Sequence, residues 1–213
     1  MDNIKWIFFD LGHTLINEDF SQRKRIENAV DYLKEKGVNV SFNEFYSLVC
    51  KASREYKSPF VTAFNQLYDA GNHVFVPYPA EFEILYDDTE AVLKELTKKY
   101  KLAVIANQSK GTNERLKKFG IYDYFNFILA SSDVGYSKPD LRIFQSAIIK
   151  ASCKSCEAIM VGDRLDNDIV PAKKTGMGTV WIKQGYGGMQ SIKEDDYKPD
   201  FTVASLNELL KIF

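Results

Sequence analysis

The sequence lacks the features that mark most specialised protein classes. It has only three cysteines and two histidines among 213 residues, and its 28 basic residues nearly balance its 29 acidic ones. A formal net charge of −1 gives no basis for binding nucleic acid or an acidic membrane surface. No apolar run approaches the roughly 20 residues that a membrane-spanning helix needs. We therefore expect a globular protein whose partner is neither nucleic acid nor a membrane.

The cysteines and the first residues favour the cytoplasm. An odd number of cysteines fits a reducing compartment better than a disulfide framework. Cys153 and Cys156 form a lone Cys-x-x-Cys, and no second pair of ligands accompanies it, which argues against zinc. The N-terminal segment has no basic region, and Asp10 interrupts its apolar run, so we expect no signal peptide.

A short apolar run, rich in β-forming residues, opens residues 4–15 and predicts a buried strand. The strand ends on Asp10, and Gly12 and Thr14 follow closely. Open α/β sheets bind ligands at the carboxyl ends of their strands, so Asp10 is a candidate functional residue. Two simpler explanations stay open on this segment alone. Asp10 could cap a turn, and Gly12 could supply a positive φ.

Residues 17–87 have a helical pattern in which no strand is predicted. Ser41 and Glu44 form a capping box that opens one of the expected helices, and Pro59 suits the first position of another. His73 is expected to be an ordinary surface residue. The expected helices cover residues 17–37, 41–58 and 59–71, with a short apolar helical piece at residues 82–86.

From residue 88 onward, strands and helices alternate regularly, which predicts a parallel sheet with helices on both faces. The expected strands are 101–106, 127–130, 158–161, 179–182 and 201–203. The expected helices are 87–99, 112–119, 141–150, 167–175 and one that begins at residue 205. The predicted fold is therefore α/β, with a Rossmann-like core formed by residues 1–16 and 88–213. Residues 17–87 are predicted to be a helical cap inserted after the first strand.

Polar side chains follow the predicted strands at their carboxyl ends. Asp10 follows the first strand, and Asn107 follows the strand at 101–106. Asp163 and Asp168 follow the strand at 158–161. Lys138 precedes a proline, which disfavours a helical backbone there and lets the side chain reach the same sheet edge. Because the carboxyl ends of parallel strands meet at one edge, we expect these side chains to converge.

Helix capping explains some of the polar residues but not the whole set. We expect Asp140 and Asn167 to be helix caps. Three converging carboxylates, in contrast, repel one another unless a cation offsets their charge. Mg²⁺ prefers a few carboxylates together with waters and a phosphate oxygen. The sequence therefore predicts a site for Mg²⁺ and an anion, with a lysine beside it.

Four segments resemble, in order, the motifs of the haloacid dehalogenase-like (HAD) hydrolase superfamily. They are Asp10-Leu-Gly12-His-Thr14, the strand ending at Asn107, Ser137-Lys138-Pro139-Asp140 and Gly162-Asp163-x4-Asp168. Residues 17–87 resemble the helical C1-type cap of that superfamily. Each motif alone is weak, but the four in sequence are specific and span the predicted core.

The resemblance implies a Mg²⁺-dependent phosphatase of a small phosphorylated metabolite. Asp10 would attack phosphorus, and water would then hydrolyse the aspartyl-phosphate. Lys138 would offset the negative charge of Asp10 and the phosphoryl group. The implied metal ligands are Asp10, the backbone carbonyl of Gly12, Asp163 and Asp168. The implied phosphate-binding residues are Asn107, Leu11 and Gly12. We expect a monomer or a homodimer.

Two positions depart from the usual pattern of the superfamily. Gly12 stands where its phosphatases carry a second aspartate as general acid and base, a group typically worth ~10²–10⁴-fold in rate. Ala106 stands where a serine or threonine would contact the phosphate. We therefore expect slow turnover, which is best with a leaving group that needs no proton, such as an acyl phosphate or a sugar 1-phosphate. His13 is a candidate replacement for the missing acid.

Two other functions stay open. A binding or regulatory protein that keeps this fold without turnover would also fit Gly12 and Ala106. A 2-haloacid dehalogenase would use an aspartate nucleophile without Mg²⁺, and the Asp163–Asp168 pair argues against it. The candidates for selecting a substrate are Arg23, Arg54 and Lys57, which spacing alone does not place over the site.

Overall fold

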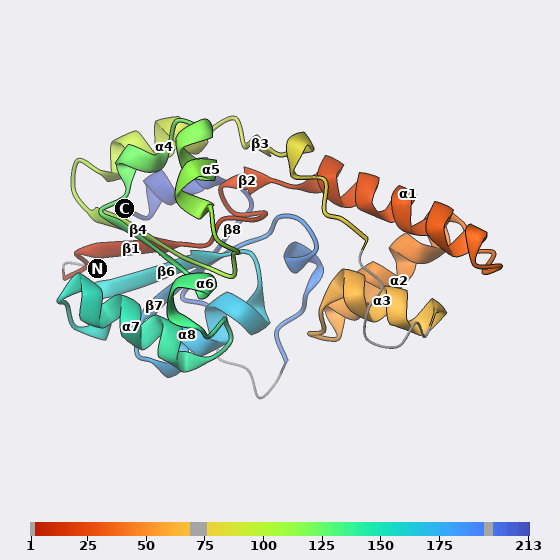
Figure 1. The fold of residues 1–213 in the computed structure, drawn as a ribbon. Coiled ribbons are helices and arrows are strands. Elements are labelled where there is room, and N and C mark those ends of the chain that lie inside the picture. Colours follow the sequence, from red (N-terminus) through yellow and green to blue (C-terminus); the bar gives the residue numbers. More distant parts are fainter. Residues whose placement is uncertain (1–2, 69–75, 194–197) are drawn as a thin grey trace.

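A six-stranded parallel sheet organises the computed structural model of the chain, which describes residues 3–68, 76–193 and 198–213. The strands run in the order β5-β4-β1-β6-β7-β8, and each neighbouring pair is parallel. The first strand of the chain therefore lies inside the sheet, with a partner on each side (Figure 1). The strands are β1 (Trp6–Phe9), β4 (Lys101–Ala106), β5 (Phe127–Ala130), β6 (Ala158–Gly162), β7 (Gly178–Ile182) and β8 (Phe201–Val203).

Helices cover both faces of the sheet, because alternate residues of each strand point to opposite faces. Ile7 and Phe9 belong to one apolar cluster, and Trp6 and Phe8 belong to another. The first cluster includes side chains of α4 (Thr89–Leu96), α5 (Thr112–Lys118) and the 3₁₀ helix Leu206–Lys211. The second includes side chains of α7 (Leu141–Ala151) and α8 (Val170–Lys174), while α6 (Ser131–Val134) directly follows β5 (Figure 1). The predicted α/β, Rossmann-like fold is confirmed.

Three helices between β2 (Ile16–Asn17) and β3 (Ile84–Leu85) form an apolar cluster of their own beside the sheet (Figure 1). They are α1 (Asp19–Glu35), α2 (Phe42–Arg54) and α3 (Pro59–Leu67). The capping box at α2 is present, since the Ser41 hydroxyl accepts from Glu44 N at 3.3 Å and the Glu44 carboxylate accepts from Ser41 N at 2.8 Å. Pro59 occupies the first turn of α3, as predicted. The predicted end of that helix at residue 71, and His73, lie outside the described residues.

The prediction of no strand within residues 17–87 is wrong. β2 (Ile16–Asn17) pairs antiparallel with β3 (Ile84–Leu85), which lies where the short helical piece was expected, and a 3₁₀ turn, Ala80–Phe82, comes just before it. The two strands are the connections that lead out of the sheet and back to it, so their backbone groups satisfy each other. Strands of two residues are too short to produce a detectable period of two in the sequence.

The helix expected at 167–175 also differs from its prediction. A π-helical turn, Leu165–Ile169, comes first and α8 continues from it, so Asn167 lies inside the turn and does not cap a helix. The side chain that accepts from the free backbone at the start of the turn is Asp168, whose Oδ2 lies 3.0 Å from Arg164 N. Asp140, in contrast, caps α7 by accepting from Arg142 N at 2.9 Å. The C-terminal helix is the 3₁₀ segment named above.

Arg115 of α5 contacts both of the connections, around β2 and β3, that lead out of the sheet and back to it. Its Nε and Nη2 atoms lie 2.8 and 2.6 Å from the two carboxylate oxygens of Glu83, just before β3. Nη2 also lies 3.2 Å from Glu18 Oε1, just before α1, and Nη1 lies 2.8 Å from Gln108 Oε1. The Glu83 side chain is only 2% exposed, so Arg115 provides the opposite charge that offsets the burial of this carboxylate.

We expect Arg115→Met to lower the free energy of unfolding by about 3–5 kcal/mol, because it leaves the buried Glu83 carboxylate without its partner. Urea-induced unfolding measures the change. The control is Arg142→Met, which removes an ion pair between two more exposed side chains and should move the urea midpoint little. Equal shifts in both variants would refute the role given to Arg115.

Candidate functional site

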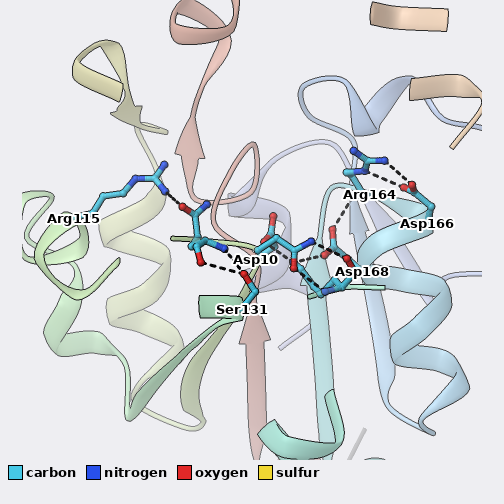
Figure 2. Close-up of polar contacts among 9 residues, drawn as sticks. Asp10, Arg115, Ser131, Arg164, Asp166 and Asp168 are labelled. Atoms are coloured by element: carbon cyan, nitrogen blue, oxygen red, sulfur yellow. Dashed lines mark hydrogen bonds and ion pairs between the residues drawn. The ribbon is translucent and has the colours of Figure 1, made fainter. Parts of the chain in front are cut away.

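The predicted site residues meet at the carboxyl edge of the sheet, around one lysine. Asp10 directly follows β1, and its backbone N–H donates to Val161 O of β6 at 2.9 Å. Lys138 Nζ lies 2.6 Å from Asp10 Oδ1 and 2.6 Å from Asp168 Oδ1. Figure 2 shows Asp10 and Asp168 close together, with Arg115 on one side and the Arg164–Asp166 pair on the other.

Asp10, Asp163 and Asp168 form a carboxylate cluster that could hold a metal ion. One oxygen of each lies within 4.8 Å of the others, and Asp163 and Asp168 are buried. Within the described residues, the Asp163 carboxylate has no hydrogen-bond donor, although its backbone oxygen accepts from Trp181 Nε1 at 2.6 Å. A cluster of hard oxygen donors that lines a cavity fits Mg²⁺.

The charges in this cluster are poorly balanced. Burial raises the pKa of Asp163 well above its usual range, and the neighbouring carboxylates of Asp168 and Asp10 add to the shift. Burial likewise raises the pKa of Asp168 to about 6, although the Lys138 ammonium opposes that shift. Burial lowers the pKa of Lys138, but its two ion pairs outweigh burial, so the pKa ends above its ordinary value. The nearby Arg164 is itself paired with Asp166. A further cation would therefore stabilise the site.

Asn107 holds the lysine-bearing segment against the end of β4. Its Nδ2 donates to Lys138 O at 2.8 Å, and its Oδ1 accepts from Lys138 N at 2.7 Å. These bonds use both ends of the side-chain amide, so Asn107 positions Lys138 while it lines the cavity. Leu11 is fully buried, so only its backbone could serve the predicted phosphate contact.

In the loop after Asp10, the reason for a glycine at position 12 differs from the one considered from the sequence. Gly12 is absent from the positive-φ residues, whereas His13 has a φ of 51°. What Gly12 provides is space, because a Cβ atom there would lie 2.6 Å from Glu18 Oε1. The Glu18 side chain is only 13% exposed, and burial raises its pKa. The simpler explanation that Gly12 supplies a positive φ therefore does not hold, and Glu18 was not among the predicted site residues.

A cavity of about 240 Å³ opens between the carboxylate cluster and the helices α1 and α3. On the helical side it is lined by Gln22, Arg25 and Phe60, among others. The Arg25 guanidinium lies 3.8 Å from the Phe60 ring centroid, and Nε donates to Val76 O at 3.3 Å.

The cation that lines this cavity from the helical side is Arg25, which is not one of those expected. Arg23, Arg54 and Lys57 do not line it, and Arg23 and Lys57 instead pair with glutamates on the surface. Arg25 was missed because it stands in a basic run that resembles an exposed helix face. The spacing contained a usable signal, since Arg25 lies four residues from both Ser21 and Ala29, which are buried.

Among the described helices, none combines the length and apolar content needed to cross a bilayer.

Comparison with known proteins identifies the family to which the chain is similar. A family model described as "Haloacid dehalogenase-like hydrolase" matches residues 7–182. The chain is 29% identical to a glyceraldehyde 3-phosphate phosphatase of Pyrococcus furiosus, over 100% of this chain and 94% of that protein. It is 33% identical to the protein of the same name from Methanocaldococcus jannaschii, over 98% and 96%. The crystal structure of a HAD phosphatase from Thermococcus onnurineus superposes with a TM-score of 0.70 at 27% identity, over 98% and 97% of the two chains.

We expect Asp163→Asn to stabilise the metal-free protein at pH 7.5 on the order of 1–3 kcal/mol, because the amide removes a buried negative charge that lies beside Asp168 and Asp10. The folded-state pKa of Asp163 is raised, so its contribution to stability is present at low pH and is lost as the pH rises through that pKa. The stability gained by Asp163→Asn over the wild type should therefore become smaller towards pH 4. Urea unfolding in EDTA at both pH values measures it.

The matched control for that measurement is Asp166→Asn, which removes the partner of Arg164 and should destabilise the protein. Added Mg²⁺ should raise the unfolding midpoint of the wild type more than that of Asp163→Asn. A metal-free Asp163→Asn protein less stable than the wild type at pH 7.5 would contradict this electrostatic account.

Proposed function

The chain belongs to the haloacid dehalogenase-like hydrolase family, and on that premise we propose that it is a phosphatase of a small phosphorylated metabolite. The observation that carries the proposal is Lys138 Nζ at 2.6 Å from both Asp10 and Asp168. This arrangement holds one carboxylate at the opening of a cavity and offsets its charge, as a nucleophile facing a phosphate requires. The relatives named as phosphatases cover nearly the whole chain, which supports the same reaction.

Asp10 is the nucleophile in this proposal. A carboxylate oxygen of Asp10 attacks phosphorus, and the bond from phosphorus to the leaving oxygen breaks. Water then attacks the aspartyl-phosphate, releasing inorganic phosphate and restoring the carboxylate. Lys138 stays fixed between Asp10 and Asp168 throughout, so its charge is already in place when negative charge develops.

Asp10, Asp163, Asp168 and the backbone carbonyl of Gly12 would hold Mg²⁺. The grouping of the three carboxylates and the burial of Asp163 and Asp168 support that assignment. Bound there, Mg²⁺ would supply positive charge to the phosphoryl oxygens. The three carboxylates and Lys138 would keep those oxygens close to Asp10.

We assign residues 17–87 as a cap over a core formed by residues 1–16 and 88–213. The separate apolar cluster of α1 to α3, together with the cavity between those helices and Asp10, supports this division. A cavity of about 240 Å³ suits a small metabolite, and the names of two relatives point to a three-carbon phosphate such as glyceraldehyde 3-phosphate. Arg25 would contact the end of the substrate that lies away from the phosphorus.

We expect Asp10→Asn to reduce turnover to background, because an amide is a poor nucleophile. The assay is phosphate release from a panel of phosphate esters and acyl phosphates with Mg²⁺, repeated in EDTA. Asp140→Asn, which alters a helix cap and an ion pair with Arg142 away from the cavity lining, is the matched aspartate control and should stay active. If no substrate is hydrolysed faster by the wild type than by Asp10→Asn, the chain is a binding protein that has lost turnover.

Arg25→Gln should raise KM for glyceraldehyde 3-phosphate about 10–100-fold, the value of a charged hydrogen bond, with a smaller effect on kcat. Acetyl phosphate, which has little structure beyond its phosphate, should be affected less. The control is Arg23→Gln, two residues away on the same helix but exposed and paired with Glu27. Similar KM changes in both variants would remove Arg25 from the binding site.

A further inference from the structure

A partly buried carboxylate that the proposed mechanism does not use faces the nucleophile loop. Glu18 lines the same cavity as Asp10. Its Oε1 atom lies 2.6 Å from the place of a Cβ atom on Gly12, two residues beyond Asp10. Its carboxyl group therefore fills the space that a side chain at position 12 would occupy.

The Glu18 carboxylate is held in place by two long contacts. Arg115 Nη2 lies 3.2 Å from Glu18 Oε1, and Gln22 Nε2 lies 3.4 Å from Oε2. The same guanidinium makes shorter contacts with both oxygens of Glu83, at 2.6 and 2.8 Å. Glu83 is therefore the main partner of Arg115, and Glu18 is oriented towards the cavity by the longer contact.

The reaction needs a group that can give a proton to an alkoxide leaving group. Asp163, Asp168 and Lys138 belong to the metal and ion-pair cluster and are committed there. His13 is the other candidate in the cavity lining. Its ring packs edge-on against Tyr186 with centroids 5.7 Å apart, and Nδ1 lies 3.6 Å from Asp19. Glu18, in contrast, lies directly over the loop that carries the nucleophile.

We propose that Glu18 is the general acid and base of the phosphatase reaction, an inference that rests on the proposed function. As the bond from phosphorus to the leaving oxygen breaks, its electron pair goes to that oxygen, and the Glu18 carboxyl proton moves to it to form the alcohol. Water then attacks the aspartyl-phosphate and gives its proton to the Glu18 carboxylate. The bond from phosphorus to Asp10 breaks, and its electron pair returns to the Asp10 carboxylate. Glu18 is protonated again at the end of the cycle.

The test compares leaving groups in Glu18→Gln, which keeps the shape of the side chain and its contact with Arg115. For glyceraldehyde 3-phosphate and phenyl phosphate, kcat/KM should fall ~10²–10⁴-fold, the usual contribution of a general acid. For acetyl phosphate, whose acetate leaving group needs no proton, the fall should be less than ~10-fold because only the second step uses Glu18. Glu83→Gln, the other partner of Arg115 and outside the cavity lining, should show no dependence on the leaving group.

A compensating change provides a second test. Gly12→Asp alone should lower activity, because its Cβ would meet the Glu18 carboxylate. In a Glu18→Ala background that space is free, and a carboxyl group returns to the same place from position 12. The double variant should then hydrolyse glyceraldehyde 3-phosphate at least ~10-fold faster than Glu18→Ala.

Four results would overturn the proposal while leaving the proposed function intact. They are equal losses on esters and acetyl phosphate in Glu18→Gln, no loss on either, a selective loss in His13→Gln instead, or a wild type that hydrolyses acetyl phosphate but neither ester. A wild type that hydrolyses none of the three probes with Mg²⁺ would instead refute the proposed function itself.

Discussion

The ion pairs of Lys138 are the interaction on which the rest of the site depends. Its ammonium lies between Asp10, at the end of β1, and Asp168, in the turn after β6, at 2.6 Å from each. Without a cation there, the carboxylates that the parallel sheet brings to one edge would repel one another in a buried setting. Asn107 fixes the backbone of Lys138 with two hydrogen bonds, so the position of the cation is set by the end of β4.

Arg115 has the corresponding role for the helices beside the sheet. Its guanidinium contacts Glu18 on the connection that leaves the sheet and Glu83 on the connection that returns to it. The short β2–β3 pair joins those connections and fixes their register. One guanidinium therefore sets where α1 begins relative to the nucleophile loop, which links the placement of the helices to the chemistry of Asp10.

The sequence predicted the features that depend on repeated patterns. β4, β5 and β8 have the predicted bounds, because apolar runs bounded by turn residues specify buried strands. Asp10, Lys138, Asp163 and Asp168 converge because parallel strands end at one edge. The β2–β3 pair was missed because two residues show no period. Arg25 and Glu18 were missed because a charge near a helix start is normally exposed, and only tertiary packing turns these two towards the cavity.

Gly12 shows how a local departure can be misjudged when it is considered alone. From the sequence, the absence of a side chain there removes an acid and weakens the argument for catalysis. In the fold, the same absence admits the carboxylate of Glu18, which a Cβ atom at position 12 would displace. A carboxyl group thus stands near the nucleophile in either arrangement, and the helix start supplies it in place of the loop. Residues 12 and 18 are therefore coupled by sterics, and the effect of a substitution at one depends on the residue at the other.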